Sequence, residues 1–278
     1  MHATPCSQTP KPMTIPFSKY DGAGNDFVVV DNRAGTLSLT PEQIARVCHR
    51  RHGVGADGLL LLGAPKDGYD FVMRYYNSDG YPADMCGNGG RCIAAFAHRL
   101  GLSRITDQGP TLRFLADDGP HDAVVLAWDD ISAAGVVDLG MKDVDDSSVQ
   151  RCLDGWLLDT GVPHYVQRVD DLAHFDVAGE GRSIRRLPQL GPEGANVNFV
   201  EPLPDGRLMV RTYERGVEDE TWACGTGVTA CAIVTGCKRL STRGGEFTVD
   251  YRLHQGVYTH VRLIGPVSLN FTGTFLNS

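Results

Sequence analysis

The chain has 278 residues, of which 42% are hydrophobic, and this length favours two domains over one. Its formal net charge of −8, with no basic cluster beyond the short one at 182–186, argues against a nucleic-acid partner. It also lacks the run of about 18 apolar residues that a membrane span requires, so no membrane partner is expected.

The start of the chain reads as a tail followed by strands and turns. Residues 1–12 lack the apolar core of a secretory signal, so we expect them to be disordered and the protein to be cytoplasmic. Residues 17–33 combine a glycine-containing turn with a β-branched strand. The segments 55–65 and 70–80 have strand-like content and end in turns, which indicates a hairpin-rich sheet.

Two helices are predicted in this half. The first has Thr40 as its N-cap, Pro41 at its first position and Gly53 at its end. The second is rich in alanine, with apolar residues at helical spacing, and it ends at Gly101. We expect this second helix to be buried and to begin at or just after Cys86.

The second half repeats this pattern. Strands are predicted within 155–169, 196–203 and 207–216, with a turn-rich section at 187–195. The tail at 245–275 alternates like antiparallel strands and carries no helix signal. The sequence therefore predicts a sheet-rich second unit.

One short motif occurs twice. Cys86 and Cys224 lie about half the chain apart, and each is followed by Gly-x-Gly and then by a helix of small residues. Weak similarity at such a period indicates internal duplication. The acidic sequence near 130–150, which lacks a regular pattern, then marks the boundary between the two copies.

The position of these two cysteines points to chemistry. A glycine-rich helix start exposes backbone N–H groups without internal partners, and its positive dipole end favours an anion such as a carboxylate. The same position lowers the pKa of a cysteine because the thiolate is the charged form. Two such thiols facing one cleft would suit the inversion of a carbon centre, one removing a proton and the other delivering a proton to the opposite face.

The remaining cysteines are best interpreted as packed side chains. No cysteine lies in a C-x2-C pair, which argues against a structural zinc site, and thiols stay reduced in a cytoplasmic protein. This interpretation applies to six cysteines, at positions 6, 48, 92, 152, 231 and 237.

Ordered sequence blocks extend this pattern along the chain from Phe17 onward. They are GAGNDF (22–27), GADG (55–58), NSDG (77–80), CGNGGRC (86–92), PH (163–164), ANVNF (195–199), YERG (213–216) and ACGTG (223–227). In these blocks the sequence resembles diaminopimelate epimerase, a family of pyridoxal-independent amino acid epimerases.

The resemblance implies an α+β fold of two pseudo-symmetric domains. Each would be a mostly antiparallel sheet wrapped around a central helix, with the active site in the cleft between them. The N-terminal domain would cover 13–133, completed by the C-terminal strand 268–278, and the C-terminal domain would cover 134–267.

The resemblance also implies an isomerase that interconverts LL- and meso-2,6-diaminopimelate, on the route to lysine and to peptidoglycan precursors. No cofactor and no metal are expected, and no lysine lies in a matched block where pyridoxal phosphate could bind. A homodimer is the oligomeric state that the family implies.

The family's site residues can be placed on this chain. Cys86 and Cys224 would be the two bases, and Glu214 and His164 would tune the pKa of the thiols. The expected substrate-binding residues are Asn25, Asn77, Gly87, Asn88, Asn196, Glu214, Arg215, Gly225 and Thr226. Among these, Arg215 suits the distal carboxylate, which arginine grips in a bidentate fork.

Two departures and two alternatives accompany this hypothesis. Val162 stands where many members have a polar residue, and one extra residue separates Arg215 from Cys224. One alternative is a proline-racemase-like relative acting on another amino acid. The other is a thiol redox or thiol-based binding protein that uses Cys86 and Cys224 as a switch.

Overall fold

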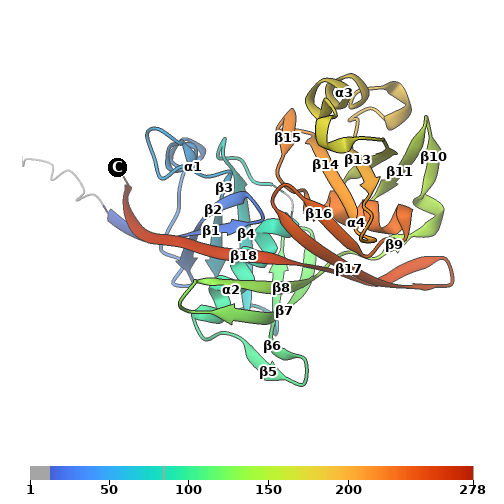
Figure 1. Cartoon of the computed structure of the whole chain (residues 1–278). Helices are drawn as coiled ribbons and strands as arrows, with labels where there is room; N and C mark the ends of the chain where they lie inside the picture. Colours follow the sequence, from blue (N-terminus) through green and yellow to red (C-terminus); the bar gives the residue numbers. More distant parts are fainter. Residues whose placement is uncertain (1–12, 84, 278) are drawn as a thin grey trace, which may run out of the picture.

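The computed structural model describes residues 13–83 and 85–277. The predicted disorder of residues 1–12 lies outside this range. Two sheet-rich lobes share one long strand (Figure 1), and strands account for far more of the described chain than helices do. This is the α+β class that the sequence predicts, with sheets wrapped around helices.

The strands follow one another along both halves of the chain. Those of the first half are β1 (Met13–Gly22), β2 (Asn25–Asn32), β3 (Gly58–Gly63), β4 (Phe71–Asn77), β5 (Arg104–Thr106), β6 (Gly109–Ala116), β7 (Gly119–Asp129) and β8 (Ala134–Gly140). Those of the second half are β9 (Val144–Asp145), β10 (Gln150–Cys152), β11 (Gly155–Asp159), β12 (Pro163–Arg168), β13 (Asn196–Pro202), β14 (Leu208–Glu214), β15 (Asp219–Thr221), β16 (Arg239–Thr242), β17 (Gly245–His254) and β18 (Val257–Asn277).

The described helices are few. They are α1 (Pro41–Cys48), α2 (Gly87–Arg99), α3 (Val177–Ile184) and α4 (Gly225–Thr235), with short 3-10 turns at Asp146–Ser148, Leu172–His174 and Pro188–Leu190.

The order of strand pairing repeats between the halves. In the first half β2 pairs parallel with β3, β3 antiparallel with β4, and β4 parallel with β6. In the second half β12, β13, β14 and β16 repeat this sequence of parallel, antiparallel and parallel pairs. Helices α2 and α4 occupy equivalent places in the two copies, as the repeated cysteine motif predicts.

Each of these two helices is the centre of its lobe. Every residue of α2 from Gly87 to Ala97 is buried, and the helix packs against β1, β2, β7, β8 and β18. Helix α4 is apolar on all sides and is buried in the same way, against β11–β14 and β16–β18. A helix without a polar face must be enclosed, and its small side chains let strands approach from several directions.

Strand β18 joins the two lobes (Figure 1). Its first part pairs with β17, its middle with β8, and residues 268–277 pair with β1. The end of the chain therefore returns to its beginning. The residue bounds assigned to the two domains stay a prediction.

Helix α1 is shorter than the sequence predicts. Thr40 caps α1 as expected, in a capping box with Gln43, but the helix ends at Cys48 rather than at Gly53. The chain turns there because the Nδ1 atom of His49 accepts the backbone N–H groups of Arg51 and His52.

Helix α3 was not predicted from the sequence. It contains Gly179 and Gly181, and glycine disfavours helix by about 1 kcal/mol relative to alanine. Asp176 caps it, and a side chain at Gly181 would overlap Tyr213. Tertiary packing therefore decides this helix, which lies between β12 and β13 as α1 lies between β2 and β3.

Candidate active site

The first turns of α2 and α4 meet between the lobes. A Cβ atom built on Gly225 would stand 3.3 Å from the Cα atom of Gly87 and 2.9 Å from the Leu263 side chain. The Asn88 side chain crosses this junction and donates a hydrogen bond to the Ala223 carbonyl at 2.9 Å. Because both helix starts lack side chains at their leading residues, two positive dipole ends come together at one place.

Cys86 is the N-cap residue of α2. Its thiol donates to Asn25 Oδ1 at 3.5 Å, and the backbone N–H groups of Asn88 and Gly89 face its sulfur. Burial raises the pKa of Cys86 to about 11, and these N–H groups oppose the rise only in part.

Cys224 is the N-cap residue of α4 and is almost fully buried, with 7% of its surface exposed. Its sulfur lies 3.4 Å from Thr226 Oγ1, and the Gly227 N–H also faces it. Burial raises the pKa of this thiol too, and the nearby Glu214 carboxylate adds to the rise.

The expectation that the helix starts lower both pKa values is therefore wrong, because burial outweighs them. The dipole and amide contributions exist, but a helix end contributes only about 0.3–2 kcal/mol, whereas burial of a charged group shifts a pKa by up to several units. The sequence shows the helix start but not the depth of burial.

Asn25 is held in one orientation beside Cys86. Its Nδ2 group donates to Asp57 Oδ2 at 2.8 Å, which leaves Oδ1 facing the Cys86 thiol and the Asn88 side chain. Asp57 is in turn bound by Arg50, so the amide rests on a charged network. The predicted residues Asn25, Cys86 and Asn88 thus form one hydrogen-bonded group.

The predicted residues of the second lobe form another group around β13 and β14. Asn196 Oδ1 accepts the Arg215 backbone N–H at 2.7 Å, and Glu214 accepts the Thr221 hydroxyl at 3.0 Å. Burial raises the pKa of the Glu214 carboxyl. Within residues 13–83 and 85–277, no hydrogen bond or ion pair joins the Arg215 guanidinium to another group, so it is free to bind an anion.

His164 lies under the start of α4. Its Nε2 atom lies 2.9 Å from Thr226 Oγ1, and its Nδ1 atom lies 3.1 Å from the Asn198 amide nitrogen. Burial, with a smaller effect from Arg215, lowers the pKa of His164 to about 3, so the ring is neutral. The Thr226 hydroxyl therefore lies between the His164 ring and the Cys224 sulfur, and the thiol-tuning role of the histidine stays a prediction.

Two predicted features lie at the edge of this group. Asn77 is exposed at the end of β4, opposite Gly58, and its side chain makes no hydrogen bond in the described part of the chain. Val162 lies in the loop before β12, where its carbonyl accepts the Thr160 N–H. In the same loop, the Thr160 hydroxyl donates to the Thr226 carbonyl at 2.9 Å.

Several residues of the site were missed at the sequence level. Asn198 and Asp57 fix the orientation of His164 and Asn25, and Arg91 binds the Gly87 carbonyl and Asn88 Oδ1. Each lies inside a matched block, so the blocks contain them, but only the contacts reveal what they do.

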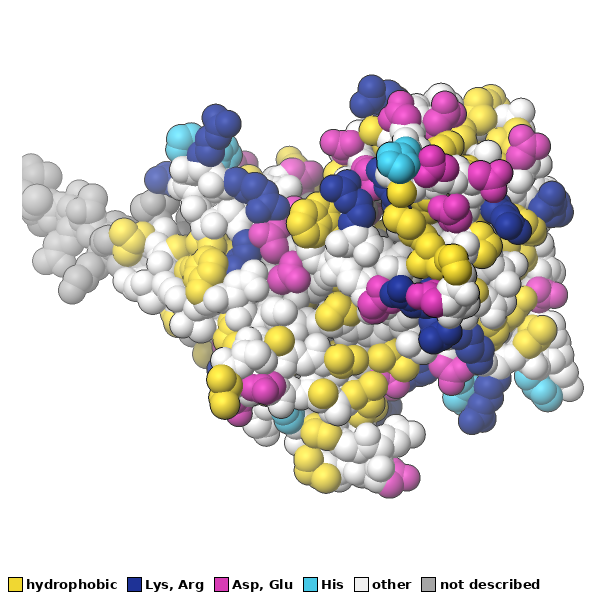
Figure 2. Space-filling model, viewed as in Figure 1, with side chains coloured by type: hydrophobic (Ala, Val, Ile, Leu, Met, Phe, Trp, Pro, Cys, Tyr) yellow, Lys and Arg dark blue, Asp and Glu magenta, His cyan; other side chains and the backbone are white. Residues whose placement is uncertain are grey.

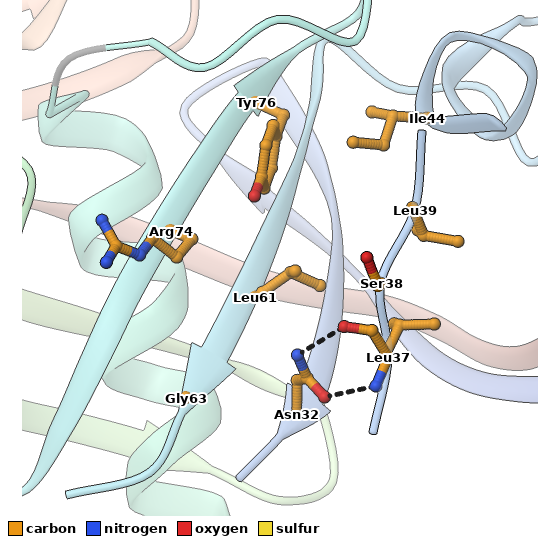
Figure 3. Close-up of a pocket in the computed structure, with 9 residues that line it drawn as sticks. All are labelled: Asn32, Leu37, Ser38, Leu39, Ile44, Leu61, Gly63, Arg74 and Tyr76. Carbon is orange, nitrogen blue, oxygen red and sulfur yellow. Dashed lines mark hydrogen bonds between the residues drawn. The ribbon is translucent and has the colours of Figure 1, made fainter. Parts of the chain in front are cut away.

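A separate cavity of about 180 Å³ lies on the outer face of β2–β4, beneath the segment 37–39 that leads to α1 (Figure 3). Asn32 closes it by bonding to the Leu37 backbone. None of the predicted site residues lines it, and we assign it no role.

The described residues contain no cluster of three or more potential metal ligands, and none of their helices is long and apolar enough to cross a membrane. On the face shown in Figure 2, lysine and arginine side chains are intermixed with aspartate and glutamate.

Comparison with known proteins adds a sequence-level finding. The family model described as diaminopimelate epimerase matches residues 17–111 and 156–256. The chain is 41% identical over 269 residues to the diaminopimelate epimerase of Flavobacterium psychrophilum, covering 92% of this chain and 98% of the relative. It is 44% identical over 261 residues to that of Chlorobaculum tepidum, covering 91% and 98%.

Solved structures share the fold at much lower identity. A hydroxyproline epimerase from Agrobacterium vitis superposes with a TM-score of 0.66 at 15% sequence identity, covering 95% of this chain and 92% of the other. This similarity concerns the fold alone, and it confirms the two-lobed architecture of sheets wrapped around helices.

Proposed function

The chain belongs to the diaminopimelate epimerase family, and from this premise we propose that it interconverts LL- and meso-2,6-diaminopimelate. The protein is an isomerase, and this reaction supplies precursors of lysine and peptidoglycan. The observation that carries the proposal is the meeting of two helix starts, each with a cysteine as its N-cap residue, from the two copies of a repeated fold.

The paired helix starts would hold the α-carboxylate of the substrate. The first N–H groups of each helix lack intrahelical partners, and two converging dipoles favour an anion. Gly87, Asn88, Gly225 and Thr226 would present these groups, and the absence of side chains on the two glycines lets the two helix starts approach each other closely. The α-carbon would then lie between the two sulfurs.

Inversion requires one thiolate and one thiol. One sulfur, as the thiolate, takes the α-proton, and the electrons of the broken C–H bond move into the carboxylate to give an enolate-like intermediate. The other thiol then gives its proton to the opposite face and becomes the thiolate. Backbone N–H groups aimed at the carboxylate stabilise the charge that develops there.

Burial raises the pKa of both thiols, so a positive charge brought by the substrate would favour ionisation. The α-ammonium group of the substrate supplies a positive charge beside the sulfurs, and an opposite charge within about 4–6 Å lowers a thiol pKa.

The distal end of the substrate carries a second carboxylate and a second ammonium group. Arg215, which has no ion-pair partner among the described residues, would bind the carboxylate. The adjacent Glu214 would bind the ammonium group, and Asn25, Asn77 and Asn196 would orient the zwitterion without adding charge.

Solvent isotope incorporation tests the mechanism. Purified protein in deuterated water with LL-diaminopimelate and a reductant should form the meso isomer with deuterium at the inverted α-carbon. Cys86→Ser and Cys224→Ser should each abolish inversion, while Cys237→Ser, two residues beyond the end of α4, serves as the matched control. Normal inversion by either serine variant of the proposed bases would refute the two-thiol mechanism.

We also propose a cytoplasmic location and a homodimer. Two catalytic thiols require a reducing compartment, which supports the location. The end of β18 exposes Phe271 and Leu276 along a groove of about 490 Å³ that Phe17 also lines, which offers an apolar contact surface for a second copy. Sedimentation of the full chain and of Phe271→Ser at micromolar concentration tests this, and a wild-type monomer would contradict it.

A further inference from the structure

Asn198 is a fully buried amide on β13, within the second lobe's part of the site. Its Oδ1 atom accepts the Thr212 hydroxyl at 2.9 Å, and its Nδ2 group donates to the Tyr165 carbonyl at 3.0 Å. These partners leave only one orientation for the amide, because a flipped side chain would turn its oxygen toward the Tyr165 carbonyl.

This orientation fixes the tautomer of His164. The second hydrogen of Asn198 Nδ2 points at His164 Nδ1, 3.1 Å away, so Nδ1 must accept. A neutral imidazole that accepts at one nitrogen carries its proton on the other. His164 therefore has its proton on Nε2 and donates it to Thr226 Oγ1 at 2.9 Å.

The Thr226 hydroxyl receives that hydrogen bond and keeps its own proton available. Its oxygen is 3.4 Å from Cys224 Sγ, where a hydroxyl proton stabilises a thiolate. With the opposite histidine tautomer, Nε2 would need a donor, and the hydroxyl proton would turn away from the sulfur. The direction of this one proton thus depends on Asn198.

Gly227 provides independent evidence that the fold makes room for Asn198 at this position. A Cβ atom on Gly227 would overlap Asn198 Oδ1 and would stand 3.3 Å from both the Cys224 Cβ and the His164 ring. The equivalent Gly89 in the first copy has no contact closer than 3.5 Å. Glycine at 227 is thus required for the approach of Asn198, whereas the first copy has no such constraint.

We propose that Asn198 is a positioning residue for Cys224, acting through the Nε2–H tautomer of His164 so that the Thr226 hydroxyl donates to the Cys224 sulfur. This rests on the proposed role of Cys224 as a base. This path from Asn198 through His164 to Thr226, called the relay below, has no equivalent among the described contacts of Cys86. There the thiol donates to the fixed Asn25 oxygen.

The charged and titratable groups around the relay do not stabilise a thiolate at Cys224. Glu214 on β14 and Cys86 of the other lobe both disfavour a thiolate at Cys224, and Arg215 disfavours a positive charge on His164. A neutral donor relay is therefore the arrangement that stabilises the thiolate without charging the histidine.

The test follows alkylation of the two thiols by iodoacetamide, a neutral reagent, with peptide mass spectrometry reporting each cysteine separately in the same sample. Below its pKa a thiol reacts in proportion to its thiolate fraction. Loss of one hydrogen bond to the thiolate should lower that fraction about tenfold, equivalent to about one pH unit. Asn198→Leu and Thr226→Val should each slow Cys224 by this factor, with Cys86 changed less than twofold.

Three further variants separate the relay from a general structural effect. Thr226→Ser keeps the hydroxyl and should restore the rate, and Thr229→Val removes a buried hydroxyl from the same helix without touching the relay. The double variant Asn198→Leu, Thr226→Val should be no slower than Thr226→Val alone, because both changes interrupt one path.

Nitrogen NMR of selectively labelled histidine reports the tautomer directly. The wild-type His164 signal should show a protonated Nε2 and an unprotonated Nδ1. A protonated Nδ1, equal slowing of both thiols in Asn198→Leu, or an unchanged Cys224 rate would each overturn the proposal. None of these measurements uses diaminopimelate, so their results could be interpreted even if diaminopimelate were not the substrate.

Discussion

Gly227 and Asn198 lie so close together that a Cβ atom on residue 227 would overlap Asn198 Oδ1. The second glycine of the Cys-Gly-x-Gly turn is therefore sterically required in the second copy but not in the first. In the first copy, the atoms nearest to a Cβ on Gly89 belong to Leu60, Phe27 and Cys86, and all lie at ordinary contact distance.

Gly227→Ala should therefore be much more harmful than Gly89→Ala. The overlap forces Asn198 or the start of α4 to move, at a cost of about 1–3 kcal/mol in unfolding free energy, whereas alanine at 89 fits. Urea denaturation measures the difference, and both variants share the same intrinsic change from glycine to alanine. Equal stability losses would show that the described asymmetry has no energetic consequence.

Oxidation should join Cys86 to Cys224 and inactivate the enzyme. Both residues are free thiols in the structure, and they are the N-cap residues of two abutting helix starts. Peptide mapping without reduction should find this crosslink after mild oxidation, and a reductant should restore activity. The Cys237→Ser variant should behave like the wild type, and full activity after oxidation with no loss of free thiols would argue against the crosslink.

Arg215→Met should raise the KM for diaminopimelate about 100-fold or more, because a charged hydrogen bond and its bidentate geometry are lost. The guanidinium has no ion pair to break within the described chain, so stability should change little. Steady-state kinetics with Arg239→Met as a surface control measures this. An unchanged KM would remove Arg215 from the substrate site.

Acid should destabilise the protein through Asp26. Burial raises the pKa of this carboxyl, but hydrogen bonds from Arg50 and the buried Lys19 outweigh it and bring the pKa to about 2. Since the folded pKa lies below the unfolded value of about 3.9, the stability it contributes is present above about pH 4 and is lost as pH falls toward 2.

The expected loss is about 2 kcal/mol over that window. Asp26→Asn should be less stable at pH 7, because Lys19 loses its buried partner. Its free energy of unfolding should also depend less on pH between 4 and 2. Asp67→Asn, at a long and exposed pair with Lys66, should keep the wild-type pH slope. Chemical denaturation at several pH values measures all three proteins, and parallel slopes for Asp26→Asn and the wild type would contradict the assignment.

The sequence alone determined the local features of the fold. Thr40 with Gln43 three residues later specifies a helix start, and the small residues after Cys86 and Cys224 specify two enclosed helices, because these signals depend on neighbours in the chain. The repeated turn likewise predicted an internal duplication, which the repeated order of strand pairing confirms. Matched blocks placed the candidate site residues without any coordinates.

The tertiary structure decided what depends on distant partners. It reversed the expected direction of the Cys86 and Cys224 pKa shifts, since burial is a property of the packed molecule. It formed α3 against Tyr213 despite weak helix propensity. It also brought Asn198 to His164, 34 residues away, and so fixed a proton's position that no local pattern encodes.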